Sequence, residues 1–160
     1  MNVLGLDVGR HLGWAVVDYD DGHHVDAGTI DILADEEAAL MGNTATTVSD
    51  LVRQWSPVAI GIEAPFVHAT NKNGAATLLK QHGAVLVGLW RHTIAPAAVA
   101  PNTLKKYATG HGHSDKDAMK WAAVRQFGPV AFDLGPDAVD ALWVASWART
   151  DAIETFGGCA

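Results

Sequence analysis

Cysteine is almost missing from this chain of 160 residues, since Cys159 is the only one and lies next to the C-terminus. A single cysteine excludes an internal disulfide and fits a reducing compartment. No apolar run reaches the length of a membrane span. The N-terminus leads directly into an apolar strand, without the basic stretch of a secretory signal. We therefore expect a cytoplasmic protein that forms a single domain over residues 1–160.

Positive charge is also scarce, with 11 Lys and Arg against 18 Asp and Glu and a net charge of −7. This balance argues against a protein that coats nucleic acid nonspecifically. The basic residues nevertheless gather in the middle third of the chain, at Lys72, Lys80, Arg91, Lys105, Lys106, Lys116 and Lys120. Acidic residues gather elsewhere, in 18–21 and 35–37. Such segregation is compatible with a basic DNA-binding face on an acidic protein.

Apolar periodicity predicts five strands, at residues 2–8, 12–18, 25–32, 58–63 and 94–99. It predicts helices at 36–55, 73–91, 103–107, 114–127 and 136–149, with Ser114 as an N-cap and a frayed tail at 156–160. Three strands form a meander, and helices then alternate with strands. This order predicts an α/β fold with a mixed five-stranded sheet and helices on both faces. Five tryptophans fall in these helices and are expected to pack in the core or in a subunit interface, namely Trp55, Trp90, Trp121, Trp143 and Trp147.

Four acidic residues stand inside or beside apolar segments, where an isolated carboxylate is costly to desolvate. Asp7 ends the first strand and Glu63 ends the fourth. Asp137 and Asp140 are three residues apart on the last helix and share one face. If the two strands are neighbours, that helix can lay its acids across the strand ends. Divalent cations would keep such a cluster ionised.

This carboxylate set predicts a metal-dependent nuclease. Phosphodiester hydrolysis needs an activated water and stabilisation of the leaving oxygen, which two Mg²⁺ ions about 3.5–4 Å apart provide. Hard cations prefer carboxylate oxygens, whereas zinc sites need closely spaced Cys and His ligands, which this sequence lacks. We expect two Mg²⁺ per active site, with Mn²⁺ able to substitute.

Several motifs occur in a characteristic order. They are LGLDVG at 4–9, IEAPF at 62–66, VAPNTLKK at 99–106, the segment from Thr109-Gly110 to Ser114-Asp115-Lys116, and DAVDAL at 137–142. Over nearly its whole length the chain resembles the RuvC family of Holliday-junction resolvases, whose fold is ribonuclease H-like. The resemblance implies a structure-selective endodeoxyribonuclease that resolves four-way DNA junctions. It also implies that Asp7, Glu63, Asp137 and Asp140 are catalytic acids that bind the metal ions.

The resemblance assigns further residues to DNA contact. Phe66 corresponds to the aromatic residue that inserts at the junction centre, while Lys105 and Lys116 correspond to lysines that contact the backbone and assist catalysis. Lys106 competes with Lys105 for this role. His111 and His113 lie between glycines in a loop that we expect to touch DNA.

The family acts as a homodimer whose two sites nick opposing strands symmetrically. Helix 73–91, rich in Ala, Leu and Gly, is the candidate dimer interface.

Other interpretations remain open at the level of sequence. The chain could be a ribonuclease H-like nuclease of other specificity, acting on flap DNA or, like the RuvX relatives, on structured RNA. The Asp7-Val8-Gly9 turn also occurs in actin-like ATPases and sugar kinases, and a non-catalytic junction-binding module is conceivable. Asp137 alone could stabilise the N-terminus of its helix through the helix dipole, and Phe66 could be a core residue. A helicase partner and a cleavage sequence are not specified.

Overall fold

The computed structural model describes residues 1–66 and 72–157, and a five-stranded sheet forms its centre. The strands are β1 (Asn2–Asp7), β2 (His11–Asp18), β3 (His24–Asp31), β4 (Ala59–Glu63) and β5 (Ala97–Val99). They lie in the order β3-β2-β1-β4-β5. The first three pair antiparallel, whereas β4 runs parallel to both β1 and β5. The predicted mixed sheet is therefore confirmed.

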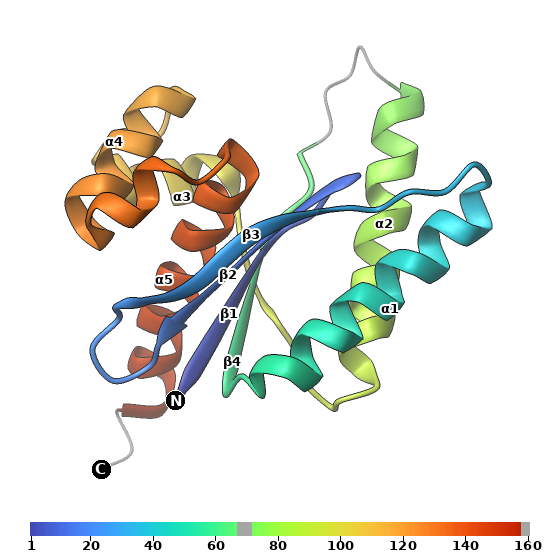
Figure 1. Ribbon diagram of the computed structural model, residues 1–160, viewed down its shortest axis with the longest axis horizontal. Coiled ribbons are helices and arrows are strands. Elements are labelled where there is room, and N and C mark those ends of the chain that lie inside the picture. Colours follow the sequence, from blue (N-terminus) through green and yellow to red (C-terminus); the bar gives the residue numbers. More distant parts are fainter. Residues whose placement is uncertain (67–71, 158–160) are drawn as a thin grey trace.

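Helices cover both faces of the sheet, as the sequence predicts (Figure 1). One face carries α1 (Glu37–Trp55) and α2 (Lys72–Trp90). The other carries α5 (Pro136–Gly157), with α3 (Pro101–Thr109), α4 (Lys116–Phe127) and the 3₁₀ turn η1 (Pro129–Phe132) beyond it. Within the described residues, no helix is both long and apolar enough to span a bilayer.

Between Asn2 and Asp7, the central strand β1 has no polar side chain, which fits its burial on both sides. Val3 packs into the core beneath α5, and its neighbour Leu4 packs into the core beneath α1 and α2. Of the helical tryptophans, Trp143 is buried in the α5 core. Trp90 and Trp121 are 77% and 55% exposed, so only some of these residues are core anchors.

The last helix is longer than predicted. Helix α5 continues past Arg149 to Gly157, so the expected fraying from residue 156 is wrong for 156–157, while 158–160 lie outside the described residues. Ala152 explains the extension, because it is 6% exposed and prolongs the buried face of the helix by one turn beyond Ala148.

Three local predictions also need correction. Strand β5 begins at Ala97 and not at residue 94, because the preceding Pro96 has no N–H to donate to a strand ladder. Helix α3 begins at Pro101, which suits a first helical turn. The N-cap of α4 is Asp115 and not Ser114, since the Asp115 carboxylate accepts a 2.8 Å hydrogen bond from the Ala118 N–H.

Candidate active site

Two of the four acids lie at the ends of neighbouring parallel strands. In the pairing of β1 with β4, Leu6 stands opposite Ile62, and the next residue on each strand is Asp7 and Glu63. Both carboxylates are half-buried at the same edge of the sheet. The predicted adjacency of these strands is confirmed.

Helix α5 brings the other two acids, Asp137 and Asp140, to this edge because it lies directly on the sheet. Three glycines permit this approach: Gly5 on β1, Gly13 on β2 and Gly61 on β4. A Cβ at Gly5 would overlap a carbonyl oxygen of α5, and one at Gly13 would overlap the carbonyl oxygen of Asp137 itself. A side chain at Gly13 would push the first turn of α5 away from the strand ends, and one at Gly5 or Gly61 would push the middle of the helix off the sheet.

The electrostatics indicate that the acids share one site. Burial raises the pKa of Asp7 well above its ordinary value, and the charges of Glu63, Asp140 and Asp137 raise it further. Burial and the charge of Asp140 raise the pKa of Glu63 to about 7. Burial also raises the pKa of Asp140, and the charge of Asp137 contributes to this rise. The charge of Lys116 opposes the rise in pKa at Asp7, Glu63 and Asp140.

Two lysines face this carboxylate cluster. Lys116, the first residue of α4, lies near enough to lower the pKa of Asp7, Glu63 and Asp140. Lys105 on α3 lowers the pKa of Glu63 and Asp140. Its neighbour Lys106 is exposed, whereas Lys105 is half-buried. The fold therefore brings Lys105, the more buried of the two competing lysines, toward the acids.

A cavity of about 170 Å³ opens beside Asp7 and Glu63. Phe66 lies on its wall and is 59% exposed, so it is a surface residue beside the acids and not part of the core. His82 of α2 lines the same cavity with 7% of its surface exposed. Burial lowers the pKa of His82, so its imidazole is neutral near pH 7.

His82 is not among the site residues predicted from the sequence. The available signal was a polar residue one turn after Leu78 on the apolar side of a helix, which is ordinarily the position of a core residue.

The two loop histidines, His111 and His113, are exposed at the surface. Neither lines the cavities beside Asp7 and Asp140. Hydrogen bonds fix the loop, since the hydroxyl oxygens of Thr109 and Ser114 are 2.6 Å apart and Ser114 also donates to the His111 carbonyl.

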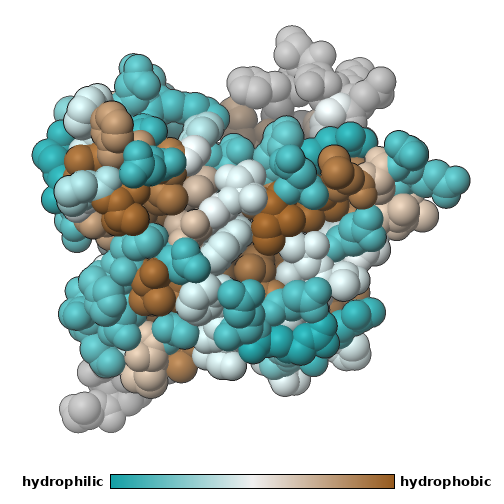
Figure 2. Space-filling view, viewed as in Figure 1, coloured by the Kyte–Doolittle hydropathy of each residue, from teal (hydrophilic) through white to brown (hydrophobic). Residues whose placement is uncertain are grey.

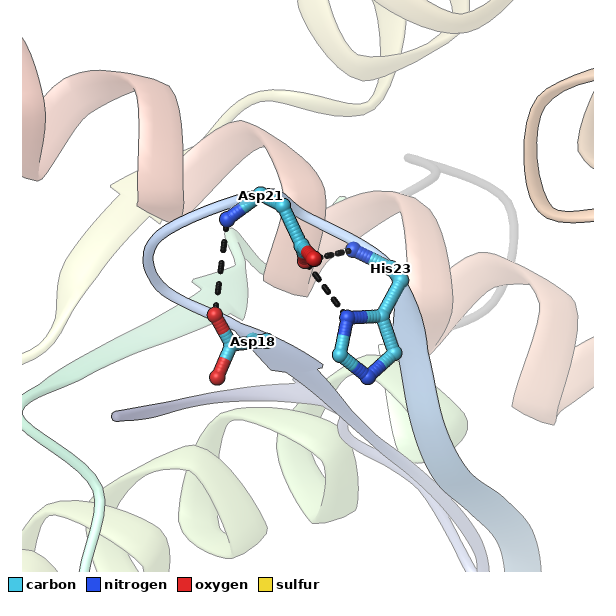
Figure 3. A group of neighbouring side chains, drawn as sticks. All are labelled: Asp18, Asp21 and His23. Atoms are coloured by element: carbon cyan, nitrogen blue, oxygen red, sulfur yellow. Dashed lines mark hydrogen bonds and ion pairs between the residues drawn. The ribbon is translucent and has the colours of Figure 1, made fainter.

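The donor set of the candidate site fits hard cations, because all four groups are carboxylates and half-buried. In the described part of the chain, the only three potential ligands within 4.8 Å of one another are Asp18, Asp21 and His23 (Figure 3). That group lies in the β2–β3 turn, at the opposite end of the sheet, and its hydrogen bonds shape the turn. The four acids do not form a group of this kind, since no three of them bring ligand atoms within 4.8 Å of one another.

Comparison with known proteins identifies the family. The model of the family described as "Crossover junction endodeoxyribonuclease RuvC" matches residues 3–146. The chain belongs to the RuvC family. A relative of that description from Hyphomonas neptunium is 34% identical over 146 residues, covering 89% of this chain and 86% of the relative. Another from Cereibacter sphaeroides is 33% identical, covering 91% and 87% respectively.

Solved structures agree with this membership. The Thermus thermophilus RuvC in complex with Holliday junction substrate has a TM-score of 0.81 and 25% identity, covering 94% of this chain and 96% of that chain. The yeast mitochondrial Holliday junction resolvase Ydc2 has a TM-score of 0.70 and 11% identity, covering 98% and 81%, and so shows the shared fold alone. The predicted ribonuclease H-like architecture of the RuvC type is confirmed.

Proposed function

We propose that this chain is a single-domain endodeoxyribonuclease that resolves four-way DNA junctions in the cytoplasm by metal-dependent hydrolysis. The observation that carries this proposal is the convergence of four carboxylates from β1, β4 and α5, three of which have raised pKa values through burial and mutual repulsion. A stable fold tolerates such repulsion poorly, and functional sites are where it is commonly found.

The four acids would hold two Mg²⁺ ions, which Mn²⁺ could replace. Bound there, the ions would activate water and stabilise charge at the scissile phosphate. The protein contributes the orientation of the carboxylates. Asp7 and Glu63 are held by strand pairing, and Asp137 and Asp140 by the close contact of α5 with the sheet.

Basic and aromatic residues beside the acids would hold the DNA. Lys116 and Lys105 lower the pKa values of Glu63 and Asp140, which supports a role for both in offsetting phosphate charge near the site of cleavage. Phe66 is exposed beside the cavity that contains Asp7 and Glu63, which supports insertion of its ring at the junction centre. Lys106, His111 and His113 would contact more distant parts of the substrate.

A homodimer would present two such sites to opposing strands. Helix α2 supports this role, because it exposes Leu79, Leu86, Val87 and Trp90 to between 48% and 77%. These residues recur at helical spacing, and an exposed apolar stripe of this kind marks an interaction surface. The alternative is a nuclease of the same chemistry that prefers flap DNA or structured RNA.

The test is a cleavage panel of a four-way junction, a flap, an RNA–DNA hybrid and a structured RNA, with Mg²⁺ or Mn²⁺ and mapped nick positions. The wild-type chain should introduce paired, symmetric nicks in the junction. The variants Asp7→Asn and Asp140→Asn should lose cleavage while still binding the junction. Asp50→Asn, which changes an exposed residue of α1, is the matched control. Full cleavage by both active-site variants would refute the proposal, and preferred cleavage of another substrate would favour the alternative.

A further inference from the structure

A second cavity adjoins Asp140, and Phe66 is not among the residues that line it. It has a volume of about 300 Å³, lies between the first turns of α4 and α5, and is lined by Lys116, Asp117, Lys120, Pro136, Val139 and Asp140. Lys116 and Lys120 are four residues apart and therefore share one face of α4. Both helices also direct their N-terminal, partly positive ends toward this space. The cavity thus combines one wall of the metal site with two lysines.

Lys120 is held in place by its surroundings. Its ammonium donates a 3.1 Å hydrogen bond to the Leu134 carbonyl and lies 5.5 Å from the centre of the Phe132 ring. An ammonium has three donors, so this bond leaves two for a ligand. A cation that is already fixed loses less conformational entropy on binding than a free surface lysine does.

An aromatic pair continues the surface beyond Lys120. Trp121 and Phe132 have ring centroids 6.0 Å apart, and each residue is 55% exposed. Val130 beside them is 43% exposed. Figure 2 shows hydrophobic residues at the surface in the region where Figure 1 places α4. Exposed rings next to a fixed cation are the combination that binds a nucleotide through its base and its phosphate.

We propose that this cavity binds the nucleotide adjacent to the scissile phosphate on the cut strand, with Lys120 holding its phosphate and the Trp121–Phe132 pair stacking its base. The inference rests on the proposed nuclease function. Lys116 faces the acids, and Lys120 lies four residues further along the helix, about 6 Å away along its axis. That offset is comparable to the distance between successive phosphates of one strand. Asp117 and Asp140 bring negative charge to the cavity, and Lys116 lowers the pKa of Asp140.

The experiment measures binding and cleavage of four-way junctions in which single phosphates near the scissile bond carry neutral methylphosphonates. For the wild-type chain, one flanking methylphosphonate should weaken binding. Lys120→Met should bind the unmodified junction more weakly than the wild type, and that methylphosphonate should cause no further loss of its affinity. The slope of log affinity against log salt should fall by about 0.9 in this variant. Lys120→Arg should restore both. Arg125→Met, which removes an exposed charge from the same helix, is the matched control.

The stacking contact is tested with an abasic nucleotide at the same position. The abasic nucleotide should weaken binding by the wild-type chain, and this loss of binding should be absent in Trp121→Leu. If no flanking methylphosphonate weakens wild-type binding, or if Lys120→Met binds with the wild-type affinity and salt slope, the proposal is overturned. If the wild-type chain does not cleave junctions at all, the proposed function itself fails, so the two failures are distinguishable.

Discussion

Replacement of Glu63 by Gln should stabilise the metal-free protein at alkaline pH while it abolishes cleavage. Burial and the charge of Asp140 raise the pKa of Glu63 from an ordinary 4.5 to about 7. The folded chain therefore binds this proton more tightly than the unfolded chain does. Stability consequently falls as the pH rises from about 4.5 to about 7, and above pH 7 the full cost of the ionised carboxylate is present.

The size of the effect follows from the two pKa values. A rise from 4.5 to about 7, at 1.36 kcal/mol per pH unit, corresponds to about 3 kcal/mol. Gln has nearly the same shape and cannot ionise, so the variant escapes this cost at pH 8. For a chain of this size the melting temperature should rise by roughly 6 to 12 °C. The variant also removes one of the charges that raise the pKa of Asp7, which acts in the same direction.

The assay is thermal and urea unfolding of both proteins in EDTA at pH 5 and at pH 8. The variant should exceed the wild type in stability at pH 8 and approach it at pH 5, where Glu63 is protonated in the folded chain. Addition of Mg²⁺ at pH 8 should stabilise the wild type more than the variant, because the ions need the carboxylate. Glu154→Gln on the exposed side of α5 is the matched control. Equal stability of Glu63→Gln and wild type at pH 8 in EDTA would refute the reasoning.

Three further predictions follow from the fold. Gly13→Ala should lower the cleavage rate on the order of 10²-fold, because the added Cβ would displace Asp137 and a small displacement is enough to cause such a loss. Gly42→Ala is the control and should cleave normally, because a Cβ added there meets nothing within 4 Å. Lys105→Met should slow single-turnover cleavage on the order of 10²-fold and Lys106→Met much less, whereas equal effects would contradict the orientation of α3. Trp90→Asp should shift sedimentation toward a monomer, and an unchanged mass would exclude α2 as the interface.

The sheet and the four acids could be predicted because their signals are local. Strands β1 and β4 contain short apolar runs, and Asp7 and Glu63 directly follow those runs. The position of α5 depends on something less visible. Gly5 and Gly61 pair across β1 and β4, and only the three-dimensional register reveals that they form the surface on which the helix lies. His82 was missed for the same reason, since only the fold shows that it lines the cavity beside Asp7 and Glu63.

The packing of α5 against the sheet holds the acids of the candidate site in position without bound ions. Ala141, Ala145 and Ala148 on the helix are at most 1% exposed, and small residues on both surfaces let the helix backbone meet the sheet. The repulsion among the acids acts on one end of a helix of 22 residues, whereas the buried contacts extend along it to Ala152. Those contacts hold Asp137 and Asp140 against a force that would otherwise separate them from Asp7. Metal ions bound by these acids would therefore neutralise an arrangement of charge that the fold already holds and would not have to assemble it.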